Sequence, residues 1–200
     1  MKNFTILGII LLSLIFTACE DSSVDPEAVS KHGNYFPLSV GSWWEYHYEG
    51  MDGFPSDTVR TDIVNTIVDT KDVTWYSIMT TGSQQYVFYR YEGDNLYFQD
   101  GKVILKKNLI KGDSWSYATV DYPTAVYDTV RVLDVGMELS IFGNDYTNVA
   151  QVVVIYDHYY KGESKIRNET NYFYAKGIGL IQTISPYGRK ISIIDYHVED

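Results

Sequence analysis

The sequence predicts an all-β protein, built as an antiparallel meander of about ten to twelve strands. Short runs rich in Val, Ile, Thr, Tyr and Phe are separated by Gly, Asp, Asn and Pro, which is the composition of strands and turns. The 200 residues include 19 tyrosines, whose rings suit a half-buried pleated surface while the hydroxyl stays wet. No stretch has a sustained 3.6-residue apolar period, so no helix is expected. A half-barrel, a barrel and a sandwich all fit this pattern.

Residues 1–18 are predicted to be a signal peptide. Lys2 supplies a positive charge, and an eleven-residue apolar run extends from Ile6 to Phe16. This run has the length of a signal-peptide core and is too short to span a bilayer, which needs about 20 apolar residues. Cys19, the only cysteine of the chain, comes directly after Phe16-Thr17-Ala18.

These residues resemble the lipobox of bacterial lipoproteins, with Phe16 where leucine is usual. The resemblance implies that the Cys19 thiol is acylated with diacylglycerol, that the signal is cut before it, and that the new amino terminus is acylated too. Two or more acyl chains anchor a protein stably, whereas a single chain holds it weakly. We therefore expect a lipid-anchored protein of a bacterial outer membrane, on either its periplasmic or its surface face.

The mature chain is predicted to consist of an acylated tether, 19–33, and a single β domain, 34–200. Residues 20–33 are polar and acidic and have no apolar period, which is typical of a linker. The whole chain carries 26 Asp and Glu against 16 Lys and Arg, a formal net charge of −10. Such a charge argues against nucleic acid as a partner and against docking to an anionic membrane by charge. Membrane attachment is expected through the lipid alone.

Turn residues predict hairpins between successive strands. Asp100-Gly101 separates two strand-like runs and favours a type I′ turn, in which both central residues have positive φ. Four lysines lie between Lys102 and Lys111. We expect them on the solvated face or on the protected edge of a strand.

A nine-residue pattern occurs twice, 71 residues apart. Leu38–Tyr46 and Leu109–Tyr117 both read Leu-x-x-Gly-x-x-Trp-x-Tyr. We predict an internal duplication, with halves at about 34–104 and 105–200. A unit of roughly five strands would bury its sheet poorly alone, so the two halves are expected to share a core.

The echo extends beyond this pattern. The tetrapeptide Asp-Thr-Val-Arg begins at Asp57 and again at Asp128, also 71 residues apart. Between 38–60 and 109–131, eight of 23 positions are identical without a gap. These matches predict that the two halves align in the same register over this stretch.

Trp44, Tyr46, Trp115 and Tyr117 are the candidate ligand-binding residues. Side chains two positions apart on a strand point to the same face, so each Trp–Tyr pair lies together. One interpretation makes the four the floor of a symmetric cleft for an apolar or sugar ligand. The other makes them core anchors that recur because the fold recurs. The second is favoured, because large aromatic side chains are mostly buried.

Three stretches, "NYFPLSVGSWWEYHYEG", "LIKGDSWSY" and "NYFYAKGIGLIQ", resemble a group of small bacterial outer-envelope lipoproteins of unknown function. Members of this group open with a Phe-Pro-Leu-x-x-Gly-x-x-Trp-x-Tyr motif and close with a Tyr-Tyr-Ala-x-Gly-x-Gly-Leu-like strand. The resemblance implies an antiparallel β domain at the outer envelope. It implies no catalytic residue.

The sequence offers little for chemistry, and we expect neither an enzyme nor a cofactor nor a metal site. It lacks a Gly-x-Ser-x-Gly nucleophile elbow. The four histidines are far apart, without the spacing of metal ligands. Asp195 and His197 lie on one face of a predicted strand, where a surface hydrogen bond is the favoured interpretation.

Three functions remain, of which the first is preferred. It is a lipid-anchored envelope protein with a non-catalytic binding or structural role, whose partner is an envelope protein, a glycan or a hydrophobic ligand. The second is a carrier of a lipid-like molecule in a curved sheet, which needs a cavity lined by large apolar side chains. The third is a glycan hydrolase, which needs two carboxylates facing each other about 5–10 Å apart in a cleft.

Overall fold

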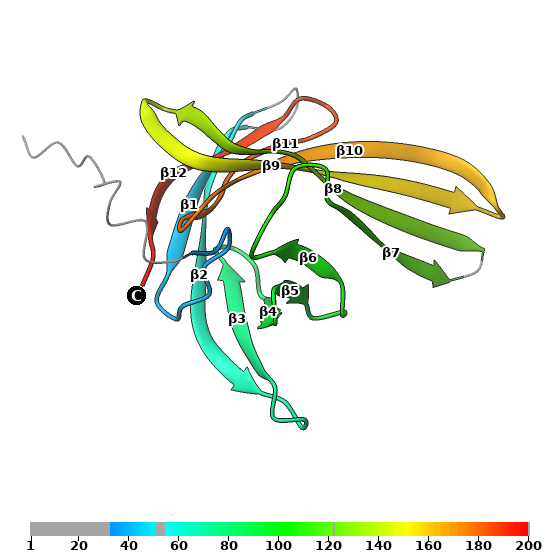
Figure 1. Cartoon of the computed structure of the whole chain (residues 1–200), viewed down its shortest axis with the longest axis horizontal. Helices are drawn as coiled ribbons and strands as arrows, with labels where there is room; N and C mark the ends of the chain where they lie inside the picture. Colours follow the sequence, from blue (N-terminus) through cyan, green and yellow to red (C-terminus); the bar gives the residue numbers. More distant parts are fainter. Residues whose placement is uncertain (1–32, 51–54, 122, 200) are drawn as a thin grey trace, which may run out of the picture.

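The computed structural model describes residues 33–50, 55–121 and 123–199. The predicted signal peptide, Cys19 and nearly all of the predicted tether lie outside these residues. The described residues form twelve strands and no helix, which confirms the all-β prediction (Figure 1). In chain order the strands are β1 (Trp43–Tyr48), β2 (Asp57–Val68), β3 (Thr74–Thr80), β4 (Tyr86–Glu92), β5 (Asn95–Phe98), β6 (Val103–Lys106), β7 (Ser114–Asp121), β8 (Thr124–Ile141), β9 (Asn144–Tyr160), β10 (Glu163–Ala175), β11 (Gly179–Ile184) and β12 (Lys190–His197).

All twelve strands belong to one antiparallel sheet, in the order β6-β5-β4-β3-β2-β1-β12-β11-β10-β9-β8-β7. Strands β1–β6 and β7–β12 therefore form two successive meanders, and the pairing of β1 with β12 joins them. Each half has six strands rather than the five expected. The sheet is curled, with β6 and β7 as its two edges (Figure 1). A single continuous sheet contradicts the sandwich among the alternatives.

The hairpin between β5 and β6 is confirmed, but its turn differs from the predicted type. The Phe98 N–H donates to the Lys102 carbonyl at 2.9 Å, and the Gly101 N–H donates to the Phe98 carbonyl at 2.9 Å. Gly101 has a φ of 87°, whereas Asp100 is not among the residues with positive φ. The loop is therefore of the three-residue kind, in which only the last residue needs a left-handed backbone.

The repeated Leu-x-x-Gly-x-x-Trp-x-Tyr pattern adopts the same turn in both halves. Gly41 has a φ of 99° and Gly112 a φ of 91°, a backbone that glycine adopts without strain. The Gly41 N–H donates to the Ile63 carbonyl at 2.9 Å, and the Gly112 N–H donates to the Val132 carbonyl at 2.9 Å. Each glycine thus turns the chain into the first strand of its half and ties it to the second.

The second echo does not keep this register. Trp44 pairs with Thr61, whereas Trp115 pairs with Val130. These partners are 69 residues apart (130 − 61), so the two Asp-Thr-Val-Arg tetrapeptides, 71 apart, differ by two positions along the ladder. The prediction of a gap-free register is therefore wrong for the second strand. Because the difference is even, the matching side chains still point to the same face.

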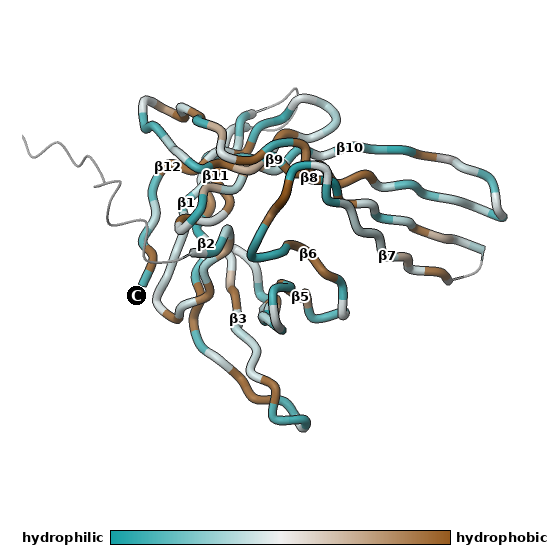
Figure 2. Tube along the Cα trace, in the orientation of Figure 1, coloured by the Kyte–Doolittle hydropathy of each residue, from teal (hydrophilic) through white to brown (hydrophobic). Residues whose placement is uncertain are grey.

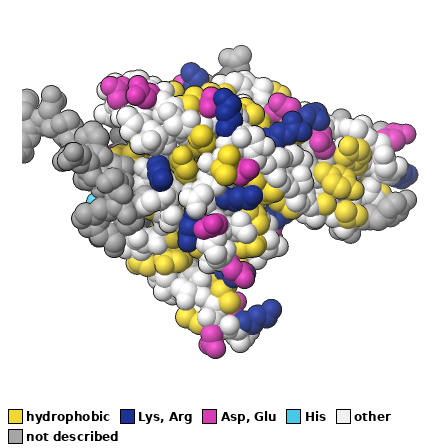
Figure 3. All heavy atoms as spheres, viewed as in Figure 1, with side chains coloured by type: hydrophobic (Ala, Val, Ile, Leu, Met, Phe, Trp, Pro, Cys, Tyr) yellow, Lys and Arg dark blue, Asp and Glu magenta, His cyan; other side chains and the backbone are white. Residues whose placement is uncertain are grey.

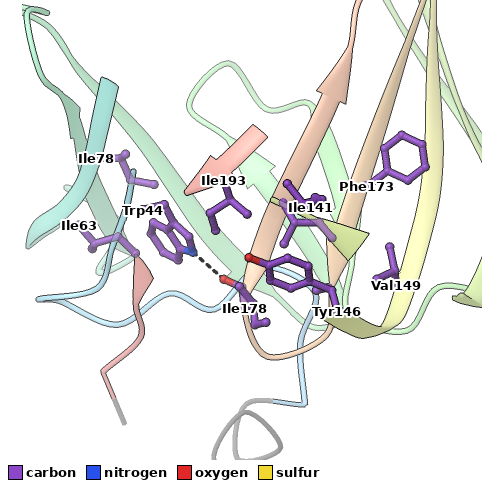
Figure 4. Packing of buried hydrophobic residues seen from close by; sticks show 11 residues of the cluster. Trp44, Ile63, Ile78, Ile141, Tyr146, Val149, Phe173, Ile178 and Ile193 are labelled. Atoms are coloured by element: carbon purple, nitrogen blue, oxygen red, sulfur yellow. Dashed lines mark hydrogen bonds between the residues drawn. The ribbon is translucent and has the colours of Figure 1, made fainter. Parts of the chain in front are cut away.

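Two hydrophobic clusters fill the curled sheet, and both combine residues of the two halves. The first surrounds Trp44 (Figure 4) and comprises Trp44, Ile63, Ile78, Ile141, Tyr146, Val149, Phe173, Ala175, Ile178, Ile181 and Ile193. The second comprises Tyr35, Leu96, Leu105, Leu109, Val130, Val132, Ala150, Val152, Val154 and Tyr174. The expected shared core is therefore present.

Apolar residues recur along the middle of β9 (Figure 2). Val152 and Val153 are both buried there, although neighbours on a strand point to opposite faces. Both faces of the sheet are therefore covered at this place.

The outer parts of β7, β8, β9 and β10 project beyond the rest of the molecule (Figure 1). We call the described residues of this region, 116–121, 123–129 and 155–169, the extension. Apolar side chains gather on it in the space-filling view (Figure 3). The exposed apolar residues of the extension include Val120, which is 67% exposed, and Ile166, which is 52% exposed. Two strands of the extension, β8 with 18 residues and β9 with 17, are much longer than a typical strand of about six. Their outer ends thus lie outside the shared core.

Gly179→Ala should destabilise the protein more than Gly112→Ala. Both glycines have a left-handed backbone, with φ of 114° and 91°, so alanine is strained at either position by about 1 kcal/mol. At Gly179 a Cβ would also lie 3.2 Å from Trp44 Nε1, whereas at Gly112 nothing lies within 4 Å. We expect an additional loss of about 1 kcal/mol or more for Gly179→Ala in urea unfolding. Equal losses in the two variants would show that the packing around Trp44 adapts freely.

Candidate functional site

Trp44 is buried and Tyr46 half-buried, and both side chains donate hydrogen bonds to backbone carbonyls of the other half. Trp44 is 3% exposed, and its Nε1–H donates to the Ile178 carbonyl at 2.6 Å (Figure 4). The Tyr46 hydroxyl donates to the Leu180 carbonyl at 3.0 Å. Burial raises the pKa of Tyr46 far above its usual value, so the phenol stays protonated and remains a donor. Both polar atoms are thereby satisfied within the fold.

Trp115 and Tyr117 lie at the place where the two edges of the sheet meet. The Trp115 Nε1–H donates to the Val103 carbonyl of β6 at 2.8 Å. Lys106 Nζ lies 5.0 Å from the centre of the Trp115 ring, and Lys102 Nζ lies 5.1 Å from that of Tyr117, both within cation–π range. Side chains thus bridge β6 and β7 where no strand ladder does. We call these four residues, together with Asp128, the seam.

The structure does not bring the two Trp–Tyr pairs together in one symmetric cleft. Trp44 belongs to the first hydrophobic cluster, and Tyr46 packs against it. Trp115 and Tyr117 pack against the second cluster. Of the four candidate residues Trp44 is buried, whereas Tyr46, Trp115 and Tyr117 are all half-buried.

Asp128 is a buried carboxylate that the sequence analysis did not select as a site residue. Its side chain is 7% exposed, and Oδ2 lies 3.9 Å from Lys102 Nζ. Oδ1 has no hydrogen-bond partner among the described residues. Burial raises the pKa of Asp128, whereas the positive charges of Lys102 and His158 lower it and Asp100 raises it further. The carboxylate is thus held at an energetic cost in its charged form.

Tyrosines flank Asp128 on the neighbouring strands. Tyr117 of β7 and Tyr156 of β9 are its direct cross-strand partners. The hydroxyl oxygens of Tyr156 and Tyr172 lie 3.3 Å apart. Burial raises the pKa of Tyr117 and of Tyr156 far above the usual value, so these phenols donate and accept hydrogen bonds but do not act as bases near neutral pH.

Lys102 forms ion pairs with two carboxylates, those of Asp100 and Asp128. Its Nζ lies 3.1 Å from Asp100 Oδ2 and 3.9 Å from Asp128 Oδ2. In a glycosidase the space between the two carboxylates holds the sugar ring and, in inverting enzymes, a water molecule. Here a lysine ammonium occupies it, which suits an ion-pair network rather than hydrolysis of a glycosidic bond.

A groove of about 320 Å³ lies where the segment before β1 crosses β3 and β4. It is lined by Asn34, Pro37, Leu38, Ser39, Val73, Thr74, Tyr76 and Tyr91. Its volume is at the lower limit of small-molecule sites, roughly 300–1,000 Å³. Its lining includes the polar side chains of Asn34, Ser39 and Thr74, unlike the predominantly apolar lining that a lipid carrier needs.

The remaining sequence candidates do not form a site. His197 Nε2 lies 3.2 Å from Glu199 Oε1, and Asp195 accepts a hydrogen bond from the Tyr196 N–H at 2.9 Å, so Asp195 and His197 have separate partners. The described residues contain no group of three or more His, Cys, Asp or Glu side chains placed to hold a metal ion. They also include no helix of sufficient length and apolarity to cross a membrane.

No family model matches the chain, and no curated protein matches it. Two solved structures are similar in shape. One, described as an exported protein with a YmcC-like fold from Bacteroides fragilis NCTC 9343, has a TM-score of 0.45 and 8% identity, covering 82% of this chain and 99% of that chain. The other, described as a lipoprotein from Parabacteroides distasonis ATCC 8503, has a TM-score of 0.44 and 9% identity, covering 82% of this chain and 98% of that chain. These scores are too low to assign a family or an activity to this chain.

Trp44→Phe should destabilise the fold more than Trp115→Phe. Phenylalanine at position 44 leaves the buried Ile178 carbonyl without its donor, which costs about 1–3 kcal/mol, and opens a small void. At position 115 the Val103 carbonyl is only partly buried, so water can replace the indole and the loss should be less than about 1 kcal/mol. Urea unfolding measures both. The reverse order would contradict the core role of Trp44.

Asp128→Asn should gain stability relative to the wild type as pH rises from about 4 to about 7. The pKa of Asp128 is higher in the folded than in the unfolded protein. Its contribution to stability is therefore complete below the unfolded pKa and is lost as pH rises through the folded pKa. Asparagine is neutral throughout and escapes this loss. The measurement is the difference in urea midpoint between variant and wild type at the two pH values.

Asp134→Asn is the matched control, with the opposite sign expected. A hydrogen bond from Lys111 and a second from the Val135 N–H lower the pKa of the exposed Asp134. Its contribution is therefore present above the unfolded pKa and is lost as pH falls through the folded pKa. Asp134→Asn should lose stability relative to the wild type as pH rises. The same sign in both variants would refute the burial of a charged Asp128.

Proposed function

We propose that this chain is a lipid-anchored protein of the bacterial outer envelope that binds a protein partner through its extension, without catalysis. The observation that carries this proposal is the contrast between interior and extension. Two packed clusters fill the curled sheet, while large apolar side chains are exposed at its projecting end. A binding surface on the outside accounts for this arrangement better than a ligand cavity inside.

Exposed and half-buried side chains form a continuous patch on one face of the extension. Cross-strand pairing places Val120 beside Ala125 and Ala125 beside Tyr159, and it places Ala118 beside Tyr127. The rings of Tyr127 and Tyr159 contact each other edge to face, with centres 5.4 Å apart. We call these five residues the extension patch. Open apolar patches with tyrosines are typical of protein-binding surfaces.

The anchor is proposed from the amino-terminal sequence. The lipobox-like stretch ending at Cys19 and the resemblance to outer-envelope lipoproteins support attachment through lipid at that residue. A tether of 14 residues, 20–33, would allow the domain to stand at most about 50 Å from the membrane. The net charge of −10 supports a partner other than nucleic acid or an anionic lipid surface.

Cys19→Ser should move the full-length protein from the membrane fraction to the soluble fraction. Without the thiol no acyl chain can be attached, and the anchor is lost. Fractionation of the producing bacterium and the intact mass of the membrane-bound protein measure this. Membrane attachment of Cys19→Ser would contradict the lipid anchor.

In the anchored protein, a photo-reactive residue at Tyr127, 45% exposed, should give a covalent protein adduct in the envelope, whereas one at Tyr86, 50% exposed on β4, should not. Equal adducts at both positions would contradict a role of the extension.

A further inference from the structure

The two edges of the sheet are protected very differently. β6 has four residues, and three lysines, Lys102, Lys106 and Lys107, lie in or beside it. Lysines on an edge strand hinder pairing with another strand. β7 has eight residues, and from Ser114 to Val120 it contains neither a charged residue nor a proline. The edge of β7 thus lacks the usual protection.

The outer half of β7 is both exposed and regular. The Trp115 hydrogen bond to Val103 covers only the start of the strand, and Ala118, Thr119 and Val120 are exposed. β7 pairs with β8 over eight residue pairs without any register shift, whereas the ladder between β8 and β9 shifts at three places. A straight, uncharged edge without a bulge is the form that accepts another strand.

The hydrogen-bonding groups available on this edge follow from the ladder with β8. The Val132 N–H donates to the Asp113 carbonyl. In an antiparallel pair, residues alternate between those bonded to the partner strand and those whose N–H and C=O point away from it. Asp113 is bonded to β8, so Ala118 and Val120 direct their N–H and C=O away from β8. Among the described strands none lies on that side, since β7 ends the sheet.

We propose that the outer edge of β7 pairs antiparallel with β7 of a second copy of this chain. In the register that uses the available groups, Ala118 of one copy bonds with Val120 of the other, and Thr119 faces Thr119 across a twofold axis. This inference rests on the binding role proposed for the extension, and it names the partner. It does not depend on the lipid anchor.

A second copy suits this edge for two reasons. The twofold arrangement matches small apolar residues with each other on one face and threonine with threonine on the other, and such cross-strand pairs each contribute about 0.2–1 kcal/mol. Ala118 and Val120 also lie on the same face as Tyr127, the cross-strand partner of Ala118. Pairing of the edges therefore joins the extension patches of the two copies into one surface. β7 contains no lysine or arginine that would hinder this pairing.

Thr119→Cys in the full-length protein tests the pairing directly. Facing residues of a pair that is not hydrogen-bonded have Cβ atoms about 4.5–5.5 Å apart, close to the distance in a disulfide. Envelope compartments are oxidising, so a disulfide-linked dimer should form and appear on a non-reducing gel. Val68→Cys is the matched control, because Val68 is 63% exposed on β2 and lies outside the extension. It should remain monomeric.

Two further variants, made in the Thr119→Cys chain, test the backbone bonds. Ala118→Pro removes the outward N–H but no bond to β8, which an edge strand tolerates. We expect the dimer to fall at least tenfold. Ala118→Val keeps the N–H, and the dimer should persist. The proposal is overturned if Thr119→Cys stays monomeric, dimerises no more than Val68→Cys, or links instead to a different protein. Fractionating the same cells reports the anchor separately, so failure of the pairing and failure of the anchor are distinguishable.

Discussion

The pairing of β1 with β12 is the contact on which the rest of the structure depends. It joins the first strand of the domain to the last, and with them two six-stranded meanders that otherwise have no shared ladder. Trp44 lies on β1, and its indole N–H donates to the Ile178 carbonyl in the turn before β11, so it adds a second link between the two meanders. Both hydrophobic clusters contain residues of the two meanders, so neither half completes its core alone. Such long-range pairing gives the domain a high contact order, which slows folding.

An open sheet of twelve strands must have two edges, and the molecule treats them differently. Curling brings β6 to the start of β7, where the Trp115 indole and two lysines close the gap without a ladder. The same closure buries Asp128, whose partner Lys102 is shared with Asp100. The outer half of β7 extends past this closure and stays open. Because the seam covers only the start of β7, the outer edge of β7 and the extension patch remain uncovered. The proposed binding role rests on these two features.

The fold was largely predictable because period-two patterns and turn residues are local signals. Alternation predicted the strands, and the Asp100-Gly101 turn predicted a hairpin, although its φ values could not be read from two residues. The candidate site was less predictable. The same Trp-x-Tyr pattern produces a buried Trp44 and a half-buried Trp115, because one strand lies mid-sheet and the other at an edge. In the sequence Asp128 stood out only as the first residue of the repeated Asp-Thr-Val-Arg tetrapeptide. Its burial depends on β6 folding over it.

By itself, the sequence determined the strand composition, the antiparallel connections and the place of the repeated glycine turns, because each depends on residues a few positions apart. Strand order around the β1–β12 junction, the two-residue difference between the halves and the choice of β6 and β7 as edges came only from the tertiary structure. These features depend on which distant strands meet, and pairing of backbone groups is nearly independent of side-chain identity. The environments of Trp115, Tyr117 and Asp128 follow from that same choice of neighbours, and for that reason no local pattern could specify them.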